Sequence, residues 1–199
     1  TETVYGVGAD ATNPRAVACI FAAKGRPQFN PLISHVLGLE QAERHAALHP
    51  HARTLAERFW PGPLTIVAPR RADSPVAELA CAGLATIALR APAHPLARDL
   101  LTAFGGPVVA PSANRSGHVS ATTAEHARAD LGGAVDLILD GGASPVGVES
   151  TIVAVDAEGR ATLLRSGAIS REAIEAVTGR LAATAAGAIE APGMMASHY

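Results

Sequence analysis

The stretch Gly105-Gly106-Pro107-Val108-Val109-Ala110-Pro111-Ser112-Ala113-Asn114 combines a turn, a short apolar strand and a polar loop. Its glycines and proline predict a turn, and Val108-Val109 is typical of a very short strand that runs directly into polar residues. In open α/β sheets, the loops that follow strand ends are the usual positions for ligands. Ser112 and Asn114 offer uncharged donors to a phosphate or a carboxylate, although a plain Ser or Asx turn explains them equally well.

Strands and helices alternate along the rest of the chain. Asn13-Pro14 and His94-Pro95 are helix starts, because proline is tolerated at the first helical position. We expect helices over residues 14–24, 39–48, 50–59, 95–104 and 122–131 and after Ser170, and strands over residues 31–37, 64–68, 86–89, 108–109, 137–139, 151–155 and 161–164. This order, with at least one hairpin-like pair, predicts a mixed, mostly open α/β sheet flanked by helices.

The composition is that of one packed globular domain with 48% hydrophobic and 17% charged residues. The net charge of −2 does not support general nucleic-acid binding, which usually needs a strong positive excess. No apolar run is long enough to span a bilayer and no signal peptide is recognisable. Cys19 and Cys81 lack a CxxC partner, so we expect buried thiols and a reducing, cytoplasmic location.

Four cations stand at the ends of predicted elements. Lys24 and Arg26 flank Gly25 where a helix ends, and Arg90 and Arg165 close two apolar strands. Glycine frees the backbone, so the two neighbouring cations can grip adjacent phosphate oxygens. The simpler interpretation is a basic helix end that suits the helix dipole. Against a slightly acidic background, the four cations together predict one anion pocket.

The histidines and Ser150 indicate neither a metal site nor an activated nucleophile. His45, His49 and His51 have no well-spaced Cys or carboxylate partners, so we interpret them as solvated helix surface. His35, inside a predicted strand, is expected to be a core or half-exposed histidine. The sequence has no P-loop and no GxGxxG motif, and Ser150 lacks a GxSxG setting.

Six motifs that occur in one order closely resemble the YrdC-domain family, the L-threonylcarbamoyladenylate synthases. They are Thr1-Glu2-Thr3-Val4-Tyr5-Gly6-Val7-Gly8, Lys24-Gly25-Arg26-Pro27, Asn30-Pro31-Leu32, Phe59-Trp60-Pro61-Gly62-Pro63-Leu64-Thr65, Pro111-Ser112-Ala113-Asn114 and Glu149-Ser150-Thr151. Any one motif would be weak, but the ordered set is very specific and spans the chain to about Gly167. The resemblance implies an α/β fold with a YrdC-like open twisted mixed sheet flanked by helices.

The tail resembles the linker of the two-domain members of this family. Ala191-Pro192-Gly193-Met194 with Ser197-His198-Tyr199 is similar to the segment that leads to a small C-terminal Rossmann-like domain, which is absent from this chain. Family members also carry a strand and a proline before the first motif, so both ends look clipped. The resemblance implies a catalytic domain over residues 1–181 and a linker over residues 182–199.

The activity that the resemblance implies is a nucleotidyl transfer. L-threonine, bicarbonate and ATP are joined into threonylcarbamoyl-AMP with release of pyrophosphate. The product serves the threonylcarbamoyl modification of a tRNA adenosine, and downstream transferase proteins perform that transfer. We expect Mg²⁺ to bridge the phosphates with few or no protein ligands, only weak direct contact with tRNA, and no membrane partner.

The resemblance also assigns residues to two sides of one pocket. The ATP side comprises Lys24, Arg26, Asn30, Thr86, Ser112, Asn114, Ser120, Arg165, His198 and Tyr199, and the threonine side comprises Thr3, His35, Arg90, Ser150 and the backbone of Ala110. His198 and Tyr199 are expected to close over the nucleotide. No nucleophilic side chain or dedicated base is evident. Lys24 and Arg26 are therefore expected to be catalytic through positioning and charge neutralisation.

Two other functions remain open at this point. Hydrogenase-maturation proteins contain a related domain that uses carbamoyl phosphate, but the Cys-rich zinc motifs that accompany it are missing here. A double-stranded RNA-binding module is the other alternative, because the related fold offers a concave basic surface. The net charge of −2 argues against RNA binding as the main role.

Overall fold

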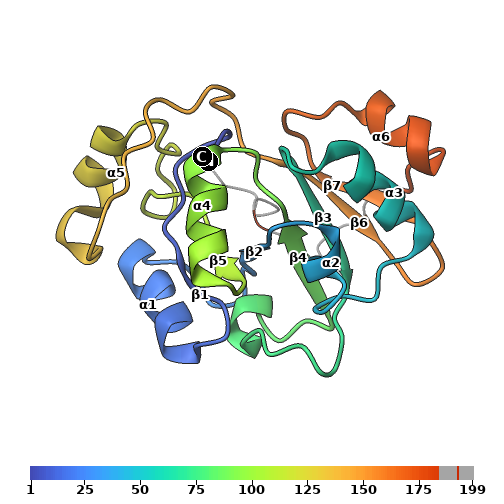
Figure 1. Cartoon of the computed structure of the whole chain (residues 1–199), viewed down its shortest axis with the longest axis horizontal. Coiled ribbons are helices and arrows are strands. Elements are labelled where there is room, and N and C mark those ends of the chain that lie inside the picture. The colour runs from blue at the N-terminus through green and yellow to red at the C-terminus, as the bar shows by residue number, and fades with distance from the viewer. Residues whose placement is uncertain (184–191, 193–199) are drawn as a thin grey trace.

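The computed structural model describes residues 1–183 and Pro192, and it contains one sheet flanked by helices (Figure 1). The strands are β1 (Ala9–Asp10), β2 (Ile33–His35), β3 (Leu64–Pro69), β4 (Thr86–Arg90), β5 (Val108–Val109), β6 (Thr151–Val155) and β7 (Ala161–Arg165). The helices are α1 (Pro14–Lys24), α2 (Leu39–Ala42), α3 (Pro50–Phe59), α4 (Pro95–Phe104), α5 (Ala124–Leu131) and α6 (Arg171–Thr178), with 3₁₀ helices at Glu78–Cys81 and Gly132–Ala134. No helix in this part of the chain is long and apolar enough to cross a membrane.

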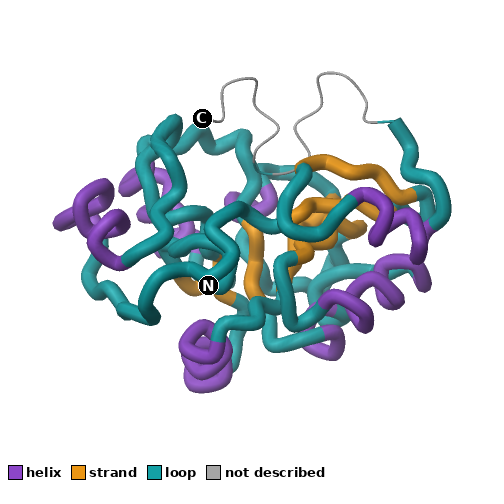
Figure 2. The backbone as a smooth tube through the Cα atoms, turned by 90° about the horizontal axis from the view of Figure 1, so that it is seen from above, coloured by secondary structure: helices purple, strands orange, loops and turns teal. Residues whose placement is uncertain are grey.

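The strand order is β1-β5-β2-β4-β3-β6-β7. β2 pairs with β4 and β3 pairs with β6 in parallel, while the other pairs are antiparallel. The predicted mixed sheet is therefore confirmed, including the antiparallel pair of β6 and β7. Seen from above, the strands lie in the middle of the molecule with helices on both flanks (Figure 2).

Helices α1, α3 and α6 cover one face of the sheet. Ile87 and Leu89 of β4 are buried in one apolar cluster with Phe21 of α1. Ile66 of β3, which pairs with Leu89, is buried in a second cluster with residues of α3 and α6. Because successive side chains of a strand point to opposite faces, the residues between these apolar ones must lie on the other side of the sheet.

That other side is the site face, which we define by Ile33 and His35 of β2 and Ala88 and Arg90 of β4. Ile33 and Ala88 belong to a small buried cluster of their own. The parallel register pairs His35 with Arg90. The period of two therefore places a histidine and a cation side by side at the carboxyl ends of neighbouring strands.

Helix ends are confirmed where a cap defines them. The side chain of Asn13 accepts hydrogen bonds from two backbone N–H groups at the start of α1. Gly25 ends α1 with a φ of 59°, in the left-handed region that L side chains rarely adopt. Gly25 thereby lets the chain turn sharply between Lys24 and Arg26. The helices α3 and α4 also begin at their predicted prolines.

Two expectations near residue 45 are wrong. The helix predicted over residues 39–48 ends at Ala42, because Ala46 instead forms an antiparallel bridge with Arg70. His45 is buried rather than solvated, and its Nδ1 lies 3.2 Å from Oγ of Ser74. Burial and the charge of a neighbouring arginine lower the pKa of this histidine. His45 is therefore part of the packing between loops and not of a helix surface.

The strand predicted over residues 137–139 does not form. Leu137 and Leu139 are 74% and 44% exposed, and they border an apolar groove of about 630 Å³ between α1 and α4. No strand of the described chain lies beside them to complete a ladder. Cys19, expected from the sequence to be buried, is exposed on α1 and lines the same groove, whereas Cys81 is buried as expected.

Candidate active site

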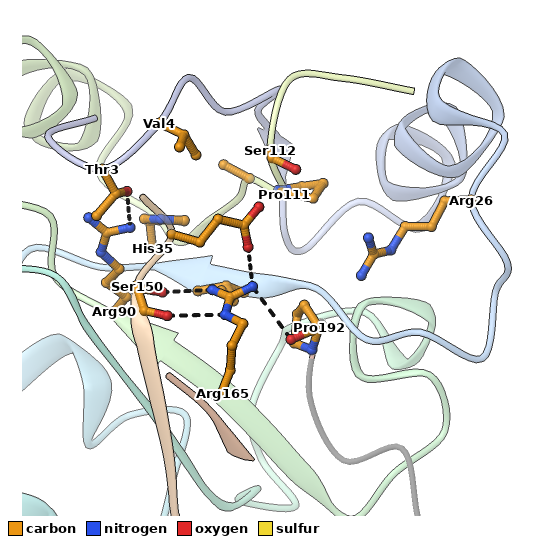
Figure 3. Close-up of a pocket in the computed structure, with 13 residues that line it drawn as sticks. Thr3, Val4, Arg26, His35, Arg90, Pro111, Ser112, Ser150, Arg165 and Pro192 are labelled. Carbon is orange, nitrogen blue, oxygen red and sulfur yellow. Dashed lines mark hydrogen bonds and ion pairs between the residues drawn. The ribbon is translucent and has the colours of Figure 1, made fainter. Parts of the chain in front are cut away.

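A pocket lies at the carboxyl ends of β2, β4 and β7, whose last residues are His35, Arg90 and Arg165. Its lining, drawn in Figure 3, consists of Thr3, Val4, Arg26, Ile33, His35, Arg90, Ala110, Pro111, Ser112, Glu149, Ser150, Arg165 and Pro192. Every residue that the resemblance assigns to the threonine side belongs to this lining. From the ATP side, Arg26, Ser112 and Arg165 belong to it.

Lys24 ties the end of α1 to the loop that follows β5. Its side chain is only 2% exposed, and Nζ donates hydrogen bonds to the backbone carbonyls of Ser112 and Asn114. Burial, with a further contribution from the charge of Arg26, lowers the pKa of Lys24 to about 8. Lys24 does lie in the last turn of α1, as the simpler interpretation has it, but its ammonium is buried against the loop after β5.

Arg26 enters the pocket from the α1 side, across from Arg90 (Figure 3). Its Nε donates to the carbonyl of Asn30 at 3.2 Å and its Nη2 donates to the carbonyl of Pro31 at 2.9 Å. Burial lowers the pKa of Arg26 to about 10, so the guanidinium stays charged at neutral pH. The turn through Asn30 thus positions this cation through the backbone carbonyls of Asn30 and Pro31.

Arg90 is paired with a carboxylate that the sequence analysis did not single out. Its Nη2 lies 2.5 Å from Oε1 of Glu2, and both side chains are almost fully buried. The remaining contacts of Arg90 are Nη1 to Oγ1 of Thr3 at 2.8 Å and Nε to the carbonyl of Gly62 at 3.1 Å. Burial alone would raise the pKa of Glu2, but the charge of Arg90 and its hydrogen bond outweigh burial and lower it.

Arg165 has a second such partner, Glu149. Nη1 of Arg165 forms an ion pair with Oε2 of Glu149, and Oε1 accepts a hydrogen bond from Ser120 at 2.8 Å. Arg165 also donates to the carbonyl and the hydroxyl of Ser150, both at 3.1 Å. The hydroxyl of Ser150 lies 2.7 Å from that of Thr65. Glu149 lies in the motif Glu149-Ser150-Thr151, but the resemblance to the family assigned a role to Ser150 and none to Glu149.

The four cations therefore fall into two kinds. Arg90 and Arg165 are neutralised by Glu2 and Glu149, as described above. Lys24 and Arg26 form no ion pair within residues 1–183 and are held by neutral carbonyl oxygens. A buried charge without a counter-ion is costly unless a ligand supplies the opposite charge. The α1 side of the pocket is consequently the side suited to a polyanion.

His35 is a neutral group at the floor of the site. Complete burial, with the nearby positive charge of Arg90, lowers the pKa of its imidazole to about 3. Nδ1 is buried without a hydrogen-bond partner in the described part of the chain. His35 can therefore exchange a neutral hydrogen bond with a ligand but carries no charge at physiological pH.

Asn114 differs from the expectation that it offers donors to an anion. Its Nδ2 donates to the carbonyls of Arg115 at 2.9 Å and His118 at 2.6 Å. The amide orientation follows from these two acceptors, and it leaves Oδ1 buried without a partner among the described residues. The donors of Asn114 thus hold its own loop together.

The remaining assigned residues lie away from the pocket lining. Thr86 is on the same face of β4 as Arg90 but at the opposite end of the strand. Asn30 and Ser120 contribute through their contacts with Arg26 and Glu149. His198 and Tyr199 lie outside the described residues.

The free space inside the pocket is small. It amounts to about 40 Å³, which is room for one or two waters but not for a nucleotide. Pro192 lines it, and its carbonyl lies 3.5 Å from Nη1 of Arg165. A ligand as large as a nucleotide does not fit this space while Arg165 and Pro192 lie as they do.

The sequence profile of the Sua5/YciO/YrdC family, described as "Telomere recombination", matches residues 1–167. A threonylcarbamoyl-AMP synthase from Bacillus subtilis (strain 168) is 49% identical over 180 residues, which are 90% of this chain and 51% of the relative. Another, from Pyrococcus abyssi, is 45% identical over 206 residues, which are 100% of this chain and 60% of the relative. The chain thus spans only part of the length of these curated relatives.

Two solved structures resemble the fold. P. abyssi Sua5 complexed with L-threonine superposes with a TM-score of 0.93 at 44% identity, over 100% of this chain and 60% of that one. E. coli YciO superposes with a TM-score of 0.76 at 21% identity, over 87% and 84%. At the lower identity only the fold is comparable. The YrdC-like α/β architecture implied by the sequence motifs is confirmed.

The buried neutral His35 predicts a pH dependence of stability. An unfolded histidine binds a proton near pH 6.5, whereas folded His35 binds one only near pH 3. Stability therefore falls as the pH drops below about 6.5, by roughly 2 kcal/mol for this one group at pH 5.

Urea unfolding at pH 7.5 and pH 5 measures this loss. His35→Gln should lose about 2 kcal/mol less than the wild type over that interval. His126→Gln, which changes an exposed histidine of α5, should lose as much as the wild type. An equal loss in all three proteins would mean that His35 is not a buried neutral group.

Proposed function

Because this chain belongs to the Sua5/YciO/YrdC family, we propose that it makes threonylcarbamoyl-AMP from L-threonine, bicarbonate and ATP. The observation that carries the proposal is a division of charge: Lys24 and Arg26 on the α1 side form no ion pair among the described residues, whereas Arg90 on the other side is neutralised by Glu2. The first side suits the triphosphate of ATP. The second suits threonine, whose ammonium and carboxylate cancel in charge.

On the threonine side, Arg90 and Thr3 offer donors to the amino-acid carboxylate. Arg90 is preorganised by Glu2, Thr3 and Gly62, so little side-chain entropy is lost when it binds. Neutral His35 offers a partner for the threonine hydroxyl without adding charge. The relative from P. abyssi, solved as a complex with L-threonine, supports this choice of ligand.

The chemistry needs two anions to meet. The threonine amine condenses with bicarbonate to give a carbamate and water. A carbamate oxygen then attacks the α-phosphorus of ATP, and the bond to the β-phosphate breaks to release pyrophosphate. Lys24 and Arg26 lower the repulsion between the carbamate and the triphosphate, which is positioning and electrostatic catalysis.

A covalent enzyme intermediate is not part of the proposal. The hydroxyl of Ser150 contacts Thr65 and Arg165, neither of which can act as a base toward it at neutral pH. Ser112 contributes its carbonyl to Lys24. The serines of the pocket therefore act as hydrogen-bonding groups in this scheme.

Mg²⁺ would accompany ATP and be held mainly by the phosphates. The described residues contain no group of three or more side chains suited to a metal ion. The bound metal would supply further charge neutralisation on the triphosphate. We also propose that the product is passed to other proteins that modify tRNA, and that the chain acts in the cytoplasm.

Pyrophosphate release is the direct test of this function. The protein is incubated with ATP and Mg²⁺, and threonine and bicarbonate are omitted in turn. We expect release only when both are present, because the attacking carbamate forms from the two together. Release without threonine would contradict the proposal. Release driven by carbamoyl phosphate in place of threonine and bicarbonate would identify a carbamoyltransferase-type reaction instead.

The lowered pKa of Lys24 predicts the pH profile of the reaction. Lys24 loses its charge above about pH 8 in the free protein. The value of kcat/KM for ATP should therefore fall above pH 8, approaching a tenfold loss per pH unit. In Lys24→Arg, whose side chain keeps its charge, the fall should move to higher pH. The same inflection in both proteins would show that another group controls the profile.

A further inference from the structure

Asp130, near the end of α5, holds two residues of the loop that follows Ser112, which is part of the pocket lining. We call residues 114–118, which follow the Ser112-Ala113-Asn114 motif, the anchor loop. Oδ2 of Asp130 accepts the backbone N–H of Arg115 at 2.7 Å. Oδ1 lies 2.7 Å from Nδ1 of His118. One carboxylate thus fixes two positions of the anchor loop to α5.

The other side of the anchor loop holds Lys24. The Nζ of Lys24 donates to the carbonyl of Asn114, and the backbone N–H of Ser116 donates to the carbonyl of Lys24 at 2.9 Å. Lys24, the last residue of α1, thus donates one hydrogen bond to the loop and accepts another from it. The position of the Lys24 ammonium therefore depends on where the anchor loop lies.

The interior of the loop is set by Asn114. Its Nδ2 bonds the carbonyls of Arg115 and His118, the two residues that Asp130 also holds. In this orientation Oδ1 of Asn114 is buried without a partner among the described residues. An unmade buried hydrogen bond destabilises the folded state. The surrounding contacts must therefore impose this arrangement, and Asp130 supplies two of them.

We propose that Asp130 is a positioning residue for the nucleotide, acting through the anchor loop on Lys24 and Asn114. The inference rests on the proposed use of ATP, because Lys24 and Arg26 form the polyanion side. It assigns no contact between Asp130 and the substrates. Disturbing Asp130 should weaken the binding of ATP and pyrophosphate and leave the binding of threonine intact, because the Arg90 side shares no residue with the loop.

Two effects of removing the Asp130 charge have opposite signs, so they can be told apart. The negative charge of Asp130 interacts with the charges of Lys24 and Arg115, so its loss makes the region around Lys24 more positive. A purely electrostatic role predicts tighter binding of ATP to Asp130→Asn. A positioning role predicts weaker binding, because the neutral amide makes poorer hydrogen bonds to Arg115 and His118.

The test is calorimetric titration of Asp130→Asn with pyrophosphate, with ATP and Mg²⁺, and separately with threonine. We expect the Kd for pyrophosphate and ATP to rise by roughly tenfold, the effect of one charge-assisted hydrogen bond. The Kd for threonine and the melting temperature should stay near wild-type values. The matched control is Glu125→Gln, which removes a charge from an exposed residue of the same helix and should change none of them.

A second variant protects the test against misfolding. His118→Gln removes one of the two anchor contacts and should weaken pyrophosphate binding less than Asp130→Asn does. Combined with Lys24→Arg, Asp130→Asn should give less than the product of the two single effects, because both act through one loop.

The outcomes separate the two proposals. Unchanged or tighter pyrophosphate binding in both anchor variants, or an equal loss of threonine and pyrophosphate binding, overturns the role of Asp130. Wild-type protein that binds pyrophosphate but releases none from ATP, threonine and bicarbonate overturns the proposed function instead, and leaves the binding comparison valid.

Discussion

The buried ammonium of Lys24, held by the carbonyls of Ser112 and Asn114, is the contact on which the site depends. It joins the end of α1 to the loop after β5, two segments that are 88 residues apart in the chain. Neutral carbonyls satisfy its hydrogen bonds but not its charge. Burying that charge is costly, and in the proposed function the triphosphate that binds beside it recovers part of this cost.

The contrast with the two arginine pairs gives the pocket its two halves. Arg90 is neutralised by Glu2, and Arg165 by Glu149. A zwitterion needs a local field of balanced charge, whereas a triphosphate needs an excess of positive charge. In the proposed function the two sides of the site meet these two requirements separately, and neutral His35 adds no charge to either side. The free volume of the pocket is small and Arg165 contacts Pro192, so the proposed function requires the side chains around Arg165 to rearrange for a nucleotide.

The sequence was sufficient where local chemistry determines the structure. Asn13 and Gly25 define α1, and the apolar runs at β4 and β6 define strands with nearly their observed bounds. Glu2 was missed because its partner, Arg90, is 88 residues away and no local pattern signals such a pair. The two residues of β1 are too few for a periodic signal. The strand expected over residues 137–139 has the right pattern, but a strand also needs a neighbour, which no pattern in one segment can supply.

A crystal structure of the protein with ATP, Mg²⁺ and L-threonine tests the two-sided site most directly. The charge distribution predicts triphosphate oxygens beside Arg26 and Lys24, and the threonine carboxylate at Arg90 and Thr3. It also predicts that Glu149 and Arg165 are displaced from their present contact. A triphosphate bound to Arg90, or one that leaves Lys24 and Arg26 without a phosphate neighbour, would contradict the division of the pocket.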